Sequence, residues 1–201
     1  MTDALAKLCG CVYQQARTRE EIDKELCFFP YQLSEEAYEF YQWDGAPVDK
    51  CSHRIWKDRH NHKTTYKCVL EKLLGTTYDF VHFLSIEEAK KLYTDDYNYF
   101  PFVEYAEESG ILAIAKLEKK VINNSPVVRL TEEGERSWFP DLTSMIMAIA
   151  EAKEKIGTLH PQTNYDDEDW ETEEYEEKIG NDWKTIKEIA LKYGSPRGSI
   201  I

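Results

Sequence analysis

The sequence predicts an α+β fold: a central, mostly antiparallel sheet of short strands, with helices packed against it and a helical extension after it. Apolar residues at helical spacing occupy both ends of the 201-residue chain, while short strand-like runs separated by turn sequences occupy its middle. Strands grouped between helices are typical of α+β folds. The 42% of hydrophobic residues suffice for a core that needs no disulfide or metal.

Two helices are predicted before residue 30. Over residues 3–16, Leu5 and Leu8 begin an apolar series at helical spacing. The sequence Thr18-Arg-Glu-Glu21 then has the pattern of a capping box, in which the hydroxyl and the carboxylate each satisfy a backbone N–H of the first turn. It predicts a second helix that runs to about Leu26.

A third helix is predicted from Ser34, a good N-cap residue. Leu33 and Tyr38 stand where a hydrophobic staple places its two apolar side chains. The helix should end near Asp44-Gly45, because glycine readily takes the left-handed conformation that stops a helix.

The middle of the chain reads as a meander of strands. The runs are Tyr78–Leu84, Tyr97–Tyr105, Ile111–Leu117, Val127–Leu130 and Arg136–Phe139. A capping box, Ser85-Ile-Glu-Glu88, opens a short helix between the first two runs. Pro101 marks its strand as an edge or a break, because proline cannot donate to a ladder. Turn sequences around Gly110 and Gly134 separate the later strands, which therefore should be antiparallel.

The last part combines a long helix, an acidic stretch and a final helix. Asp141 is suited to cap a helix whose apolar stripe is Leu142, Met145, Ile146 and Ile149. Residues 158–180 read as a linker, and a final helix carries Trp183, Ile186, Ala190 and Tyr193. We therefore expect an α+β domain over residues 1–157, with 1–17 as an extra helix, and residues 158–201 as an acidic segment and a helix docked on that domain.

Several motifs of this chain resemble one protein family. They are the helix region Leu26-Cys-Phe-Phe-Pro-Tyr-Gln-Leu-Ser-Glu-Glu-Ala-Tyr-Glu-Phe-Tyr-Gln-Trp-Asp-Gly45, the strand-to-helix step Phe83-Leu-Ser-Ile-Glu-Glu-Ala, Tyr99-Phe-Pro-Phe102, Ile111–Leu117, Pro126-Val-Val128 and the helix Leu142–Ala150. Their order is similar to that of the SUKH superfamily over roughly residues 18–157. Residues 48–75 depart from the family, since they are longer and more basic than its usual connection.

The resemblance implies a binding protein rather than an enzyme. Bacterial SUKH proteins include immunity proteins that neutralise toxins, often nucleases, and fungal members are linked to control of cell-wall synthesis. An immunity protein of this kind would bind a basic toxin domain, and a negatively charged inhibitor gains association rate and specificity toward such a partner.

The net charge of −13 is concentrated in one segment. Residues 166–177 carry nine acids and no base. They are either a solvated linker kept extended by like charges or a partner-binding strip. The strip would consist of acidic residues with two aromatic anchors: Asp166, Asp167, Glu168, Asp169, Trp170 and Tyr175. Direct binding of nucleic acid by the whole chain is disfavoured, because phosphates would be repelled.

Residues 50–67 form a basic island with six lysines or arginines and one acid. Five potential metal ligands lie in or beside it: Cys51, His53, His60, His62 and Cys68. Their spacing differs from the usual zinc patterns, although a one-residue gap would let His60 and His62 share a metal on one side of a strand. The island is therefore interpreted as a connecting segment, with a metal site and a nucleic-acid patch as alternatives.

Known catalytic motifs are missing from the sequence. It has no Gly-x-Ser-x-Gly elbow, no His-Glu-x-x-His pair and no phosphate-binding glycine loop, so we expect no enzyme and no cofactor. The odd number of cysteines, five, predicts free thiols. The start of the sequence does not read as a secretion signal, and no apolar run is long enough for a membrane span, so we expect a cytoplasmic protein without membrane contact.

Three functions remain open from the sequence. The first is a non-catalytic protein-binding module, an immunity protein in the bacterial case. The second is a metal-binding protein or hydrolase that uses the five histidine and cysteine ligands of the basic island. The third is a regulatory scaffold whose acidic tail recruits a partner.

Overall fold

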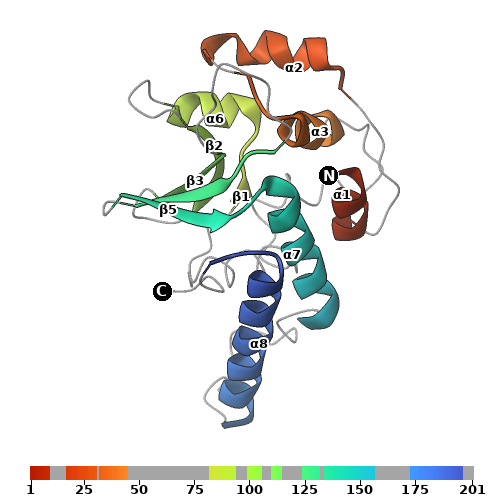
Figure 1. Cartoon of the computed structure of the whole chain (residues 1–201), viewed down its shortest axis with the longest axis vertical. Coiled ribbons are helices and arrows are strands. Elements are labelled where there is room, and N and C mark those ends of the chain that lie inside the picture. The colour runs from red at the N-terminus through yellow and green to blue at the C-terminus, as the bar shows by residue number, and fades with distance from the viewer. Residues whose placement is uncertain are drawn as a thin grey trace, which may run out of the picture.

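The structure, a computed structural model, describes residues 1–9, 17–30, 32–44, 82–93, 99–105, 110–114, 124–131, 134–156 and 173–196. Within these residues one antiparallel sheet is packed against helices, and a long helix extends below it (Figure 1). The predicted α+β fold with a mostly antiparallel sheet is therefore confirmed.

In the described residues, the sheet is a meander of five strands in sequence order. They are β1 (His82–Phe83), β2 (Phe100–Tyr105), β3 (Gly110–Ile114), β4 (Val127–Thr131) and β5 (Gly134–Phe139). Every neighbouring pair is antiparallel. The register of β2 against β3 shifts between Pro101 and Val103. The predicted break at Pro101 is thus a bulge in an internal strand, which lets a residue without an N–H sit inside the sheet.

Six α-helices accompany the sheet in the described residues. They are α1 (Thr2–Cys9), α2 (Arg19–Glu25), α3 (Glu35–Asp44), α6 (Ile86–Leu92), α7 (Leu142–Ile156) and α8 (Glu173–Lys192), with a 3₁₀ turn at Leu26–Phe28 after α2. The capping boxes predicted at Thr18 and Ser85 are both present, each with its reciprocal pair of hydrogen bonds. The start of a helix is thus fixed locally at both places.

One face of the sheet holds the main core. Phe100 and Phe102 of β2 are fully buried and meet the aromatic rings of α3, with the ring centroid of Phe40 4.7 Å from that of Phe102. Tyr99 and Val128 form a separate small cluster with Leu130. The helices therefore pack on one side of the sheet, as a half-solvated antiparallel sheet allows.

The main core extends beyond residues 18–157. Leu5 and Leu8 of α1 belong to the same buried cluster as the strands, and so do Ile186 and Ile189 of α8. The helices α1 and α8 both pack along α7. Residues near both ends of the sequence thus contribute to one core.

The predicted linker at 158–180 is wrong for its last eight residues, because α8 already begins at Glu173. The acidic composition of this stretch does not oppose a helix. Glutamate is a good helix former, and negative charges in a first turn interact favourably with the helix dipole. Residues 157–172 lie outside the described part.

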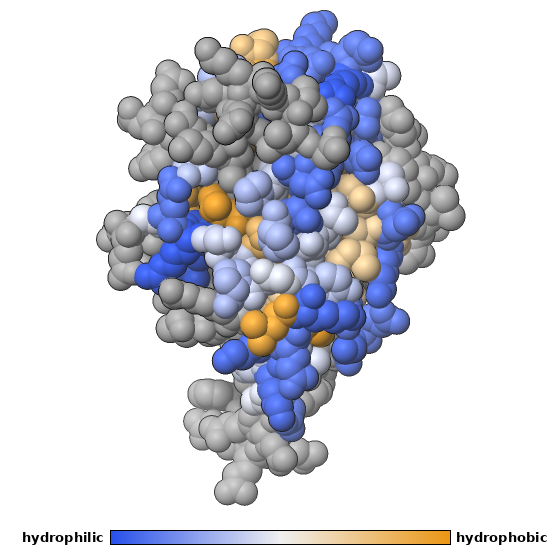
Figure 2. Space-filling model, in the orientation of Figure 1, coloured by the Kyte–Doolittle hydropathy of each residue, from blue (hydrophilic) through white to orange (hydrophobic). Residues whose placement is uncertain are grey.

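The surface of the described residues is mostly hydrophilic on the face shown in Figure 2, with a few small apolar patches. Among the large apolar side chains of the described residues, Leu191 on α8 is the exposed one. None of the described helices combines the length and the apolar character that crossing a bilayer requires.

Candidate functional site

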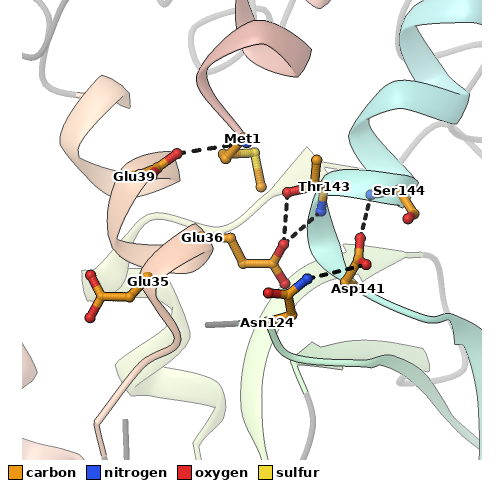
Figure 3. Close-up of a pocket in the computed structure, with 8 residues that line it drawn as sticks. All are labelled: Met1, Glu35, Glu36, Glu39, Asn124, Asp141, Thr143 and Ser144. Carbon is orange, nitrogen blue, oxygen red and sulfur yellow. Dashed lines mark hydrogen bonds and ion pairs between the residues drawn. The ribbon is translucent and has the colours of Figure 1, made fainter. Parts of the chain in front are cut away.

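A polar pocket of about 490 Å³ lies where α3 meets the start of α7 (Figure 3). Four parts of the chain line it, with Met1, Glu35, Glu36, Glu39, Asn124, Asp141, Thr143 and Ser144. Half of these residues are acidic. The pocket is therefore rich in hydrogen-bond acceptors and carries negative charge.

Glu36 forms the floor of the pocket and is only 5% exposed. One carboxylate oxygen accepts from the backbone N–H groups of Ser125 (2.8 Å) and Leu142 (3.0 Å). The other accepts from the backbone N–H (3.0 Å) and the hydroxyl (2.8 Å) of Thr143. Glu36 thus satisfies free N–H groups in the first turn of α7 and ties the 124–126 segment to α3.

Asp141 is the N-cap residue of α7, as the sequence predicted. Its carboxylate accepts from the backbone N–H of Ser144 at 2.6 Å and from the side-chain amide of Asn124 at 3.4 Å. Both acidic residues at the start of α7 therefore have fixed orientations.

Glu35 lies on the rim and is held from outside the pocket. Both of its carboxylate oxygens accept from Arg19 at 2.9 Å. The guanidinium of Arg19 lies 3.9 Å from the centre of the Tyr38 ring, and the Tyr38 hydroxyl donates to Asp23. Burial, together with the hydrogen bond to Asp23, raises the pKa of Tyr38 to about 12. Tyr38 is therefore a neutral donor at ordinary pH, and the network fixes α2 against α3.

Glu39 completes the rim, 3.7 Å from the amino group of Met1. The side chains of Glu35 and Glu39 are each 42% exposed, so both are accessible from solvent. A pocket with a buried acceptor floor and two accessible carboxylates is suited to a cationic group, such as an ammonium or a guanidinium.

None of the described residues that line this pocket is a predicted site residue. Asp166, Asp167, Glu168, Asp169 and Trp170 lie outside the described residues, and Tyr175 lies in the first turn of α8. The potential metal ligands also lie outside them: Cys51, His53, His60, His62 and Cys68. In the part of the chain that the structure describes, no group of three or more histidine, cysteine or acidic residues is arranged to hold a metal ion.

Glu36 is the site residue that sequence reasoning missed, although a signal existed. It stands beside Glu35 in the first turn of α3. Leu33, Ala37 and Phe40 are all fully buried, and Glu36 follows Leu33 by three positions and precedes Phe40 by four. An acid inside the apolar stripe of a helix points into the core, where it needs hydrogen-bond donors.

No family model, curated protein or solved structure matches this chain. The chemistry of the pocket therefore rests on its own side chains. All four hydrogen bonds to Glu36 come from donors in the first turn of α7 and in the 124–126 segment. Glu36 thus organises the backbone, whereas the rim carboxylates pair with Arg19 and the Met1 amino group and stay partly exposed to solvent.

Proposed function

We propose that this chain is a non-catalytic protein-binding module of the SUKH type, an immunity protein that acts in the cytoplasm and neutralises a basic, nuclease-type toxin. The observation that carries the proposal is the acidic pocket between α3 and α7, whose rim carboxylates are both ordered and accessible. A basic side chain of a partner protein fits this charge and this volume.

The charge of the surrounding helix supports a basic partner. Helix α3 carries four acidic residues and no basic one: Glu35, Glu36, Glu39 and Asp44. Together with the net charge of −13, this gives the molecule a field that would attract a positively charged domain. Like charges repel acidic surfaces and nucleic acid, so the same field contributes to specificity.

The order of elements is also compatible with the SUKH resemblance. The chain has a helix ending at Asp44, a strand-to-helix step at β1 and α6, a run of consecutive antiparallel strands and the closing helix α7. These elements fall within the residues 18–157 over which the motifs resemble the family. Since a fold does not determine a function, the partner has to be tested directly.

We assign the acidic segment a role in association. Asp166, Asp167, Glu168 and Asp169 would attract the partner over distance, while the aromatic rings of Trp170 and Tyr175 would make contact. The segment continues into the first turn of α8, where Glu173 and Glu174 stand.

The test begins with a candidate toxin, for example the product of a neighbouring gene. Purified chain should inhibit its nuclease activity in a stoichiometric titration. Surface plasmon resonance on the full-length chain should then show slower association when residues 166–169 are changed to Asn or Gln, and also when Glu35 and Glu39 are both changed to Gln. The loss should shrink as salt approaches 1 M, where the Debye length is about 3 Å.

A matched control separates a local contact from a general effect of charge. Glu87 on α6 is 81% exposed and pairs with Lys91, so Glu87→Gln removes one charge from a helix that does not line the pocket. Per charge removed, it should change the association rate less than either set of variants. Equal rates for all variants at low salt would contradict an electrostatic interface, and intact nuclease activity at saturating chain would contradict the immunity function.

A further inference from the structure

The helix α8 is attached to the rest of the molecule along one side of α7. Its buried stripe is Ile186, Ile189 and Ala190, with half-buried Tyr193 one turn further on. The last three of these residues follow Ile186 by 3, 4 and 7 positions, a spacing that places all four on one helical face. Ala148, Glu151, Ala152 and Lys155 repeat that spacing on α7. The two helices run antiparallel and pack along each other (Figure 1).

A single buried carboxylate fastens the polar part of this contact. Glu151 has a side chain only 7% exposed and accepts from Nζ of Lys192, the last residue of α8, at 2.6 Å and from the hydroxyl of Tyr193, the next residue, at 2.7 Å. It also accepts from Lys155 Nζ at 2.9 Å on its own helix. Lys7 of α1 is nearby and pairs with Glu154, so α1 adds a further positive charge to this side of α7.

The end of α8 is anchored a second time. Gly194 has a left-handed φ of 85°, and the N–H groups of Gly194 and Ser195 donate back to Leu191 and Ala190. A Cβ on Gly194 would lie 3.0 Å from Cγ of Pro140, just before α7. The helix end thus fits against Pro140 with no space for a side chain.

The apolar part of the contact is small by comparison. In residues 180–192 of α8, where burial is described, three apolar residues are buried, whereas α7 contributes Leu142, Met145, Ile146, Ala148, Ile149, Ala150 and Ala152 to the core. The first half of α8 extends away from the other described elements (Figure 1). Elements with few buried apolar contacts open at a lower free energy than the core does.

We propose that α8 is a latch: it releases from α7 as one unit, under the control of Glu151, while the five-stranded body stays folded. Release uncovers the stripe of Ala148 and Ala152 on α7 together with the isoleucines of α8. The groups that hold the latch are the positive charges of Lys192 and Lys155 and the hydroxyl of Tyr193, all directed at one carboxylate. This device is independent of the proposed immunity function.

Hydrogen–deuterium exchange of the full-length chain tests the latch. Amides of residues 183–195 should exchange faster than those of 127–131 and 142–152 in the unchanged protein. Glu151→Gln should accelerate exchange in 183–195 by about tenfold and leave the other two segments unchanged. Gly194→Ala, which removes the second anchor through strain and contact with Pro140, should do the same.

The matched control is Glu154→Gln, three positions after Glu151 on α7. The carboxylate of Glu154 is 67% exposed and pairs with Lys7. It should leave exchange of 183–195 unchanged. If 183–195 exchanges in step with 127–131 in every variant, α8 and the sheet unfold as one unit and the latch is disproved. If Glu151→Gln leaves exchange in 183–195 unchanged, the control assigned to Glu151 is wrong.

Discussion

At the scale of single residues, Glu36 shows how a buried charge is made tolerable. Its carboxylate has left bulk water, yet four donors from the 124–126 segment and the first turn of α7 surround it. A buried charge costs several kcal/mol unless it is paired in this way, and removing it leaves its donors unsatisfied. The arrangement therefore joins α3 to two separate segments through one side chain.

Replacing this carboxylate should be costly. Glu36→Ala leaves the N–H groups of Ser125, Leu142 and Thr143 without their acceptor, and should lower the free energy of unfolding by about 3 kcal/mol. Glu39→Ala, on the same helix and half exposed, should cost less than about 1 kcal/mol. Urea unfolding followed by circular dichroism measures both. A cost for Glu36→Ala no larger than that for Glu39→Ala would contradict the role of Glu36.

Glu151 gives a dependence on pH. Its hydrogen bonds with Lys192, Lys155 and Tyr193 lower the pKa of Glu151 from 4.5 to about 2. Because the folded pKa is the lower one, the contribution of Glu151 is present above about pH 4.5 and is lost as pH falls toward 2. The ratio of α8 exchange rates between Glu151→Gln and the unchanged protein should therefore be about tenfold at pH 7 and approach one near pH 2. A ratio that stays constant over this range would exclude titration of Glu151 as the cause.

At the scale of elements, the helix starts obey local rules. The reciprocal hydrogen bonds at Thr18 and Ser85 each join residues three positions apart, 2.8 Å from Thr18 N to Glu21 and 3.0 Å from Ser85 N to Glu88. Such contacts depend on neighbouring residues alone. This is why both helices begin where the sequence predicted.

These caps supply a prediction for the elements. Thr18→Ala and Ser85→Ala should each lower the free energy of unfolding by about 1 kcal/mol, because each leaves a first-turn N–H without its acceptor. The control is Thr185→Ala within α8, where the hydroxyl donates to the carbonyl of Asn181 and caps nothing. That change should be within about 0.5 kcal/mol of neutral. Thermal and urea unfolding of the three variants compare them, and equal costs would rule out a capping contribution.

At the scale of the whole molecule, the described core involves residues from both ends of the sequence. Leu5, Leu8, Ile186 and Ile189 share one cluster with the sheet. Shortening the chain to residues 1–157 would therefore expose apolar stripes on α7, and interface tests need the full-length chain. The charge pattern acts on this same scale, because the field of an acidic molecule depends on all its charges.

The basic island at 50–67 provides a further test for the molecule as a whole. Its ligand spacing is unlike that of known zinc sites, and the core is large enough to fold without a metal. Purified protein should contain no stoichiometric zinc, and a chelator should leave the melting temperature unchanged. Elemental analysis and a thermal scan check this. One zinc per chain, lost together with stability in His60→Ala, would instead favour the metal-binding alternative.

The sequence by itself determined the α+β class, the order of the strands and the starts of helices α2, α3, α6 and α7. These features follow from the spacing of apolar residues and from caps that span three residues, so neighbours along the chain encode them. The extent of α8 was underestimated, because a strongly acidic stretch was interpreted as a linker although glutamate favours helices.

Only the tertiary structure decided the pocket and the attachment of α8. Glu36 meets donors 89 and 106 positions away, and Glu151 meets Lys192, 41 positions away. Nothing in the neighbourhood of either glutamate specifies which distant donors it will meet, although the apolar stripe around Glu36 does show that it must be buried. Long-range partners are set by how the sheet and helices pack together, because burying the apolar faces brings those polar groups to the same place.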